Sequence, residues 1–240
     1  MNSLLTIELG LISWAEAYAL QQRIVAARKA GTIEDVLLLC EHPHVITLGR
    51  NANRSNLLAS EHVLRQKNVE LQPTNRGGDV TYHGPGQIVG YPILNLGNIK
   101  RDVGWYVRTL EEAMIRATAD LGIEAFRVPG KTGIWVQAGA TEEKLGAIGV
   151  HISRWVTSHG FAYNVATDLR YFDLIVPCGI PDRKATSLEK LLHRNVKPGE
   201  VQPHLVQHVA ELFSLSPRQL SREELHGALG QIEAAAPLEK

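Results

Sequence analysis

The most informative stretch of the chain reads Arg76-Gly-Gly-Asp-Val-Thr-Tyr-His-Gly-Pro-Gly-Gln-Ile-Val-Gly-Tyr-Pro92. Five of its seventeen residues are glycine, which suits tight turns and lets a ligand approach the backbone closely. Residues 80–82 and 88–93 have the composition of short strands, and Gly84-Pro85-Gly86 predicts a turn between them. The stretch is therefore either a hairpin decorated with polar side chains or a ligand-binding segment with exposed backbone N–H groups.

Ten specified positions of this stretch form the pattern Arg76-Gly-Gly-x-x-Thr-Tyr-His-Gly-Pro-Gly-Gln, which resembles the signature of the lipoyl(octanoyl) transferases. Two later stretches are similar to the same family, in its order and spacing. One is Lys144-Leu-Gly-Ala-Ile-Gly-Val150, and the other runs from Trp155 through His159-Gly-Phe-Ala162 to Val176-Pro-Cys-Gly-Ile180. The resemblance covers roughly residues 36–190, and a pattern of this length is far more specific than a single GxGxxG.

The pattern of hydrophobic residues predicts a mixed α/β fold. Strands are expected at 4–9, 36–40, 45–48, 125–128, 133–136, 145–152 and 155–165, with a short helix and strand within 61–72. Helices are expected from Ser13 to Gly31, from Asp102 to Gly122, and at 187–194, 203–214 and 221–233. The resemblance implies the biotin and lipoate protein ligase fold, a mixed sheet with packed helices. We expect one catalytic domain over residues 1–240, with a helical C-terminal extension from about residue 196.

Composition excludes several classes of protein. Net charge is zero and no apolar run approaches about 18 residues, so we expect no nucleic-acid partner and no membrane span. Two cysteines in 240 residues, with no signal-peptide pattern, favour a reducing, cytoplasmic location. His42 and His44 are spaced like half of a metal site, but no cysteine or carboxylate completes it, so we expect no metal.

Two residues are candidates for the chemistry. Cys178 lies between a proline and a glycine in an irregular segment, and its thiol needs a nearby cation or base to ionise. Lys144 precedes an apolar, glycine-rich strand, and a polar hairpin loop at 137–143 is expected to deliver it to the start of that strand. From the residues alone, Cys178 is either reactive or inert, and Lys144 is either functional or an ordinary surface charge. The resemblance implies a catalytic dyad in which Cys178 accepts the acyl group and Lys144 lowers its pKa.

The resemblance also places the family's substrate-binding segments on three stretches. These comprise Arg76, Gly77, Gly78, Asp79, Val80, Thr81, Tyr82 and His83; Ala147, Ile148 and Gly149; and Gly160, Phe161 and Ala162. The small residues of the last two segments are expected to let an acyl chain pass against the backbone. Phe161 and Tyr163 stand where family members often carry leucine, so we expect them to reshape that wall.

Other groups could assist the reaction. Backbone N–H groups at Gly77-Gly78 or around Cys178-Gly179 are candidates to stabilise the oxyanion. His83 is either a second base or a hydrogen-bonding partner of the glycine turn. His151 and His159 flank the substrate segments, and a structural role is favoured for both.

The resemblance implies transfer of an octanoyl (or lipoyl) group through a thioester on Cys178. The donor would be octanoyl-acyl carrier protein, and the acceptor a lysine of the lipoyl domains of 2-oxoacid dehydrogenase E2 subunits or of the glycine cleavage H protein. No cofactor and no ATP are expected, because the donor thioester is already activated. The alternatives are an ATP-dependent lipoate–protein ligase on the same fold, a cysteine hydrolase, and a non-catalytic acyl-carrier-binding module. Cys178 in its Pro-Cys-Gly setting favours the transferase.

Overall fold

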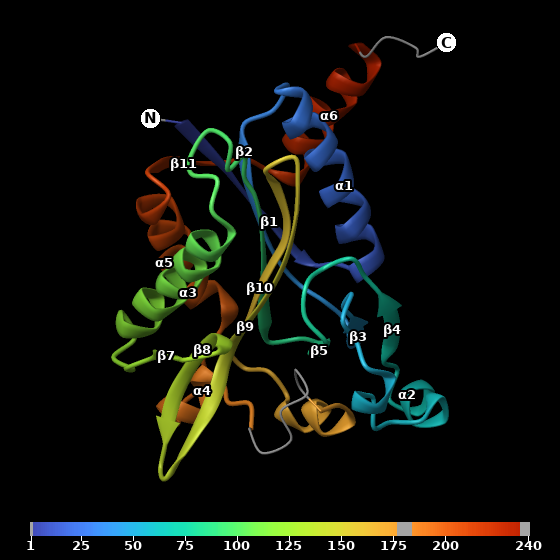
Figure 1. Ribbon diagram of the computed structural model, residues 1–240, viewed down its shortest axis with the longest axis vertical. Helices are drawn as coiled ribbons and strands as arrows, with labels where there is room; N and C mark the ends of the chain where they lie inside the picture. Colours follow the sequence, from blue (N-terminus) through green and yellow to red (C-terminus); the bar gives the residue numbers. More distant parts are fainter. Residues whose placement is uncertain (1, 177–183, 236–240) are drawn as a thin grey trace.

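The computed structural model describes residues 2–176 and 184–235, and one large mixed sheet organises them (Figure 1). Its strands are β1 (Asn2–Leu11), β2 (Asp35–Glu41), β6 (Gln87–Ile93), β7 (Phe126–Val128), β8 (Lys131–Ala138), β9 (Thr141–Ser153), β10 (Val156–Asn164) and β11 (Leu215–Gln219). They lie in the order β11-β1-β2-β6-β10-β9-β8-β7. β1 runs parallel to β2 and β11, and the other pairs are antiparallel. The predicted mixed α/β fold is confirmed.

A second, smaller sheet lies beside the large one. It contains β3 (Val45–Leu48), β4 (Glu70–Pro73) and β5 (Val80–His83), in the order β4-β3-β5. The predicted turn at Gly84-Pro85-Gly86 exists, but the strands on its two sides are not a hairpin. β5 pairs with β3 in the small sheet, whereas β6 pairs with β2 and β10 in the large one. The glycine-rich stretch therefore carries the chain from one sheet to the other.

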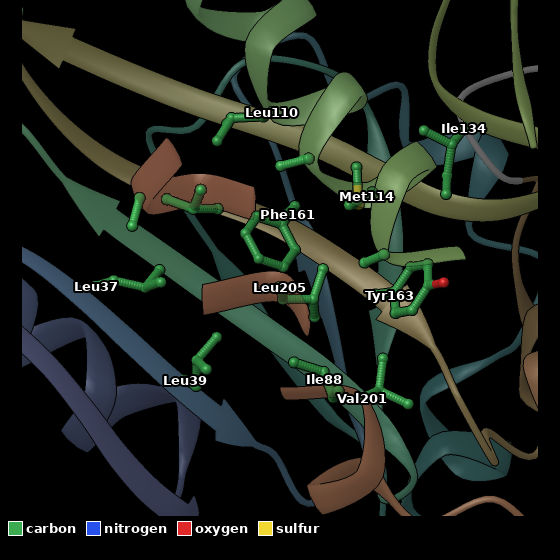
Figure 2. Packing of buried hydrophobic residues seen from close by; sticks show 14 of the residues in the cluster. Leu37, Leu39, Ile88, Leu110, Met114, Ile134, Phe161, Tyr163, Val201 and Leu205 are labelled. Atoms are coloured by element: carbon green, nitrogen blue, oxygen red, sulfur yellow. The ribbon is translucent and has the colours of Figure 1, made fainter. Parts of the chain in front are cut away.

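Helices pack against both faces of the large sheet and beside the small one. They are α1 (Trp14–Ala30), α2 (Glu61–Gln66), α3 (Val103–Ala119), α4 (Leu188–Leu192), α5 (Pro198–Leu212) and α6 (Arg222–Ala235), with 3₁₀ helices η1 (Arg54–Asn56) and η2 (Leu169–Leu174). Side chains alternate between the faces, as strand geometry requires. Leu37 and Leu39 join a core under α3 and α5, whereas Leu38 joins a second core under α1 and α6. Figure 2 shows the first of these cores, with Phe161 and Tyr163 packed near Met114 and Leu205.

Local signals predicted several helix ends correctly. Ser13 and Glu16 form the expected capping box, and Gly31 ends α1 in the left-handed conformation at φ 75°. Asp102 caps α3 by accepting a hydrogen bond from the Trp105 backbone N–H at 2.8 Å. Ser221 and Glu224 also bond reciprocally at the start of α6. These signals depend only on residues three apart, so the sequence alone is enough to reveal them.

Other boundaries differ from the prediction. α4 begins at Leu188 with Ser187 as its cap, and α5 begins at Pro198, so Pro203 lies inside that helix. The C-terminal region is not wholly helical, because β11 pairs with β1 at the edge of the large sheet. The predicted hairpin at 137–143 exists, but its loop is shorter than expected, because β8 and β9 extend into this range and turn at Gly139, whose φ is 61°. Lys144 therefore lies inside β9, not at the start of a strand.

Candidate active site

A narrow cavity of about 50 Å³ lies between the two sheets and brings the three predicted substrate segments together. Every residue predicted to bind substrate lines it except Gly77 and Tyr82. The residues that do so are Arg76, Gly78, Asp79, Val80, Thr81, His83, Ala147, Ile148, Gly149, Gly160, Phe161 and Ala162. Tyr82 points into the small core of the β3–β5 sheet, where its ring stacks on Tyr171 at 5.2 Å. Residues 80–83 alternate in direction along β5, so not all four can face one cavity.

The wall formed by the large sheet consists of small residues. Ala147 on β9 pairs with Ala162 on β10, and Gly149 pairs with Gly160. The intervening Phe161 and Ile148 border the cavity, but their side chains pack with the core on the opposite face of the sheet. Figure 2 shows Phe161 in that core. Tyr163 lies in that core as well, with its hydroxyl 2.6 Å from that of Thr118. Of the two aromatic residues expected to reshape the acyl wall, Phe161 borders the cavity and Tyr163 does not.

The two glycines of this wall serve packing. A Cβ at Gly149 would lie 3.0 Å from Arg76 Cδ, so the absence of a side chain lets Arg76 cross this position. A Cβ at Gly160 would overlap the carbonyl of Gly90 on β6, so Gly160 is required for the close approach of β10 to β6. Only Ala147 and Ala162 therefore present the surface of small side chains that the sequence predicted for the whole wall.

Arg76 connects the cavity to the small sheet. Its guanidinium donates to the carbonyl of Thr47 at 2.7 Å, to the Thr47 hydroxyl at 2.9 Å and to the carbonyl of Gly77 at 3.1 Å. Arg76 is buried, so these bonds are made away from bulk water. The Gly77 N–H donates to the carbonyl of Val150 on β9 at 2.9 Å. The glycine-rich segment is thereby fixed to both sheets, with its backbone held across the cavity.

Asp79 connects the cavity to the end of η2. Its carboxylate accepts hydrogen bonds from the Asn53 N–H at 3.0 Å and from the side-chain amide of Asn56. The carbonyl of Asn56 in turn accepts a hydrogen bond from the Val176 N–H at 2.7 Å. Val176 is the last described residue before Cys178. Cys178 itself lies outside the described residues, as does the segment 177–183 around it.

Lys144 lies on β9, three residues before Ala147 and so about 10 Å away along the strand. Its ammonium donates to the carbonyl of Thr132 at 3.1 Å and sits 4.8 Å from the centre of the Trp135 ring. The chain that follows the segment 177–183 joins β9 at this position. The Lys144 N–H donates to the carbonyl of Lys184, and the Thr186 N–H donates to the carbonyl of Lys144, both at 2.9 Å. The described residues on either side of 177–183 are therefore bonded to different places, Val176 to Asn56 and Lys184 to Lys144.

Two buried histidines line the cavity, and a third, His42, lies with its ring centre 6.0 Å from that of His83. Burial lowers the pKa of His83 to about 3, and its Nδ1 lies 2.7 Å from Oε1 of Gln87. Burial likewise lowers the pKa of His159 to about 3, with Nε2 held 2.6 Å from Asn75 Oδ1. His42, whose burial lowers its pKa to about 4, bonds to the Tyr91 hydroxyl at 2.7 Å. A base with so low a pKa accepts protons poorly near neutrality, which favours a structural role for His83.

The remaining predicted groups have simpler environments. Cys40 is buried in the core, and burial raises the pKa of its thiol, which makes that thiol a poor nucleophile. His44 bonds to the Tyr82 hydroxyl at 2.8 Å. Within residues 2–176 and 184–235, no group of three or more His, Cys, Asp or Glu side chains is arranged to hold a metal ion. No helix in the same ranges is both long enough and apolar enough to cross a bilayer.

Five lining residues were missed by the sequence reasoning: Trp14, Thr47, Val89, Tyr91 and His159. Val89 and Tyr91 lie within the glycine-rich stretch, and alternation along β6 could have identified them once the cavity face was known. His159 was noted, but only as a neighbour of the substrate segments. Trp14 and Thr47 carry no local signal, because only the tertiary fold brings α1 and β3 to this cavity.

Comparison with known proteins agrees with this geometry. Residues 13–210 match the family described as the lipoyl protein ligase A/B catalytic domain. An octanoyltransferase of Solibacter usitatus is 55% identical over 206 residues, covering 86% of this chain and 91% of the relative. The chain belongs to the octanoyltransferase family. A further member, from Acidobacterium capsulatum, is 56% identical over 192 residues, covering 76% of this chain and 78% of that protein. The predicted family and the assignment as a transferase enzyme are confirmed.

Solved structures show the same fold at low sequence identity. A bipartite lipoate protein ligase from Thermoplasma acidophilum superposes with a TM-score of 0.72 at 17% identity, covering 98% of this chain and 92% of that one. A biotin protein ligase from Aquifex aeolicus superposes less closely, with a TM-score of 0.50 at 13% identity over 98% and 76% of the two chains. The predicted biotin and lipoate protein ligase fold is confirmed.

Proposed function

We propose that the protein transfers an octanoyl group from octanoyl-acyl carrier protein to a lysine of apo lipoyl domains, through a thioester on Cys178. The observation that carries this proposal is the convergence of three separate substrate segments on one narrow cavity. Its wall of Ala147 and Ala162 suits an alkyl chain, which needs apolar surface and little width. Family membership supplies the octanoyl group as the transferred unit.

In the first half-reaction, the Cys178 thiolate attacks the carbonyl carbon of the donor thioester. A bond forms between that carbon and the cysteine sulfur, and the bond to the phosphopantetheine sulfur breaks. The leaving thiolate takes a proton from Lys144. In the second, the neutral amine of the target lysine attacks octanoyl-Cys178, an amide forms, and the cysteine sulfur leaves. The proton lost by the amine returns to Lys144, which restores the starting state.

Two backbone contacts support a Cys178–Lys144 dyad. Val176 is bonded to Asn56, whose side chain holds the cavity residue Asp79. Lys184 is bonded to the backbone of Lys144 itself. The described chain on both sides of 177–183 is thus attached to the cavity and to the proposed proton carrier. A lysine ammonium near a thiol favours the thiolate, because opposite charges stabilise each other.

The partners and setting follow from the same reaction. We propose acyl carrier protein as donor, and the lipoyl domains of 2-oxoacid dehydrogenases and of the glycine cleavage H protein as acceptors, in the cytoplasm. We also propose that residues 1–240 form one catalytic domain, since α5 packs in the same core as α3 and β11 extends the large sheet. The reaction needs no ATP, which separates it from that of a ligase on this fold.

The test is the intact mass of the protein after incubation with octanoyl-acyl carrier protein in the absence of ATP. Wild type is expected to gain one octanoyl group that hydroxylamine removes, as it does from thioesters. Cys178→Ser is expected to gain no such group, and Lys144→Ala to gain it far more slowly. Cys40→Ser is the matched control, because it removes the other cysteine of the chain and leaves the proposed nucleophile in place.

Three outcomes would contradict the proposal. A full-rate adduct in Cys178→Ser would place the acyl group elsewhere. Modification of a lipoyl domain only when ATP and free octanoate are supplied would make the protein a ligase. Carrier binding without an adduct would leave only the binding module.

A further inference from the structure

The wall of the cavity includes one large side chain from outside the glycine-rich motif and the other substrate segments. Trp14 is the first residue of α1, it lines the cavity, and only 6% of it is exposed. It is larger than any residue in the three predicted segments. A tryptophan at the boundary of a narrow cavity removes space that an acyl chain would otherwise occupy.

Trp14 and Lys144 approach the cavity from different sides. α1 packs against β10 and β6. Lys144 belongs to β9, which lies on the side of β10 away from β6. Its neighbour Trp135 is on β8, one strand farther from β6. An acyl group whose carbonyl reacts near Lys144 and whose chain enters the cavity therefore extends toward α1. Its methyl end meets the side of the cavity that Trp14 forms.

This side of the cavity is held rigidly by stacked rings. Trp14 stacks on Tyr18 with ring centres 4.9 Å apart and planes 12° apart. Tyr18 stacks in turn on His159 at 5.5 Å and 15°. His159 is fixed by Asn75 at its ring and by Gln21, which accepts its backbone N–H at 2.9 Å. Because every ring has a neighbour, Trp14 cannot swing aside without breaking the stack.

The size of the cavity makes its walls decisive. A cavity of about 50 Å³ is far smaller than the roughly 300–1,000 Å³ of typical ligand pockets. A large side chain on its boundary therefore takes up a substantial part of the space that an acyl chain needs. We propose that Trp14 is a specificity-determining residue that sets the upper limit of acyl-chain length. This inference rests on the proposed function, because it takes an acyl chain as the occupant of the cavity.

The experiment compares acyl carrier proteins loaded with hexanoyl, octanoyl, decanoyl and dodecanoyl groups, using kcat/KM for transfer to a lipoyl domain. Trp14→Ala is expected to raise the ratio of dodecanoyl to octanoyl transfer by at least about tenfold, since one methylene in a pocket is worth about 10- to 200-fold. Trp14→Phe should give an intermediate profile. Trp105→Ala is the matched control, because Trp105 packs edge-on against Phe213 on the opposite face of the sheet.

An unchanged chain-length ratio in a folded Trp14→Ala variant would overturn the inference, as would an equal shift in Trp105→Ala. If Trp14→Ala does not fold, Trp14→Phe carries the test alone, with a smaller expected shift in the same direction. Calorimetric binding of free octanoate and dodecanoate to the same variants gives a readout that needs no acyl transfer. If wild type binds octanoate but forms no acyl-enzyme, the proposed function is refuted. The ratio of the affinities for dodecanoate and octanoate would still decide the role of Trp14.

Discussion

Acidification from about pH 7.5 to about pH 5 is expected to destabilise this protein strongly, because three of its histidines are buried in the neutral form. Burial lowers the pKa of His42 to about 4 and those of His83 and His159 to about 3, all from an ordinary value of 6.5. In the unfolded chain the same groups take up protons below about pH 6.5. The unfolded state therefore binds more protons than the folded state between these limits, and stability falls as pH falls.

The magnitude follows from the size of these shifts. One histidine with a pKa of about 6.5 unfolded and about 3 folded contributes a loss of about 2 kcal/mol between pH 7.5 and pH 5. Three such groups give about 6 kcal/mol, within a total stability that is typically about 5–15 kcal/mol. The loss begins near pH 6.5 and continues until the folded-state pKa values are reached. Carboxylates with lowered pKa, such as that of Asp102, add their effect mainly below about pH 4.

The assay is urea unfolding followed by tryptophan fluorescence at a series of pH values. Wild type is expected to show a slope that approaches three protons per molecule, about 4 kcal/mol per pH unit at its steepest. His42→Gln should lower that slope by about one proton whatever its stability at neutral pH. His62→Gln is the control, because His62 is exposed on α2. A total change below about 2 kcal/mol between pH 7.5 and pH 5 would refute the reasoning, because it would mean that at most one histidine is buried neutral.

Two substitutions test the framework around the cavity. Asn56→Ala should lower kcat about tenfold or more, because its side-chain amide holds Asp79 and a hydrogen bond to a charged group contributes about 1.5–3 kcal/mol. Asn53→Ala is the control and should lower kcat far less, because the backbone N–H that binds Asp79 remains. Equal losses of kcat in the two variants would refute a specific role for the Asn56 amide. Gly90→Ala should lower the free energy of unfolding in urea by about 1–3 kcal/mol, because the added Cβ would overlap the Phe161 ring. Adding Phe161→Leu to this variant should recover part of that loss. If the losses of the two substitutions were simply additive, the clash would be contradicted.

The sequence predicted well what short-range chemistry determines. Ser13 with Glu16, Asp102 and Ser221 with Glu224 cap their helices through bonds between residues three apart, so the pattern alone carries the information. Pro198 and Pro203 show the limit of such signals. Both fit a helix start by pattern, and α5 begins at the earlier one because Glu200 accepts the Lys197 N–H at 2.8 Å.

Strand pairing was harder to predict than strand existence. β5 and β6 are joined by a glycine turn, and short separation favours a hairpin. The structure assigns them to different sheets, since the Gly86 N–H donates to the carboxylate of Glu41 at the end of β2. A Cβ at Gly86 would also overlap the carbonyl of Ala166, and its φ is 79°. That glycine permits the crossing between sheets, and the acidic partner that holds it is 45 residues away.

The tertiary contacts of the glycines also narrow the search for the oxyanion donors. Glycine-rich sequence suggested the Gly77-Gly78 backbone, but a catalytic donor must point at the position where charge develops. The Gly77 N–H already donates to Val150 on β9 at 2.9 Å, and turning it toward a substrate would detach the segment from the large sheet. Gly78 differs, because its φ of 89° reverses the backbone direction just before Asp79, at the cavity wall. Of the two glycines, only Gly78 therefore remains a candidate, beside the Cys178-Gly179 backbone. Gly78→Ala, which strains that left-handed φ, should lower kcat with little change in KM. A purely structural role for Gly78 would instead predict a loss of folded protein, with no selective effect on kcat over KM.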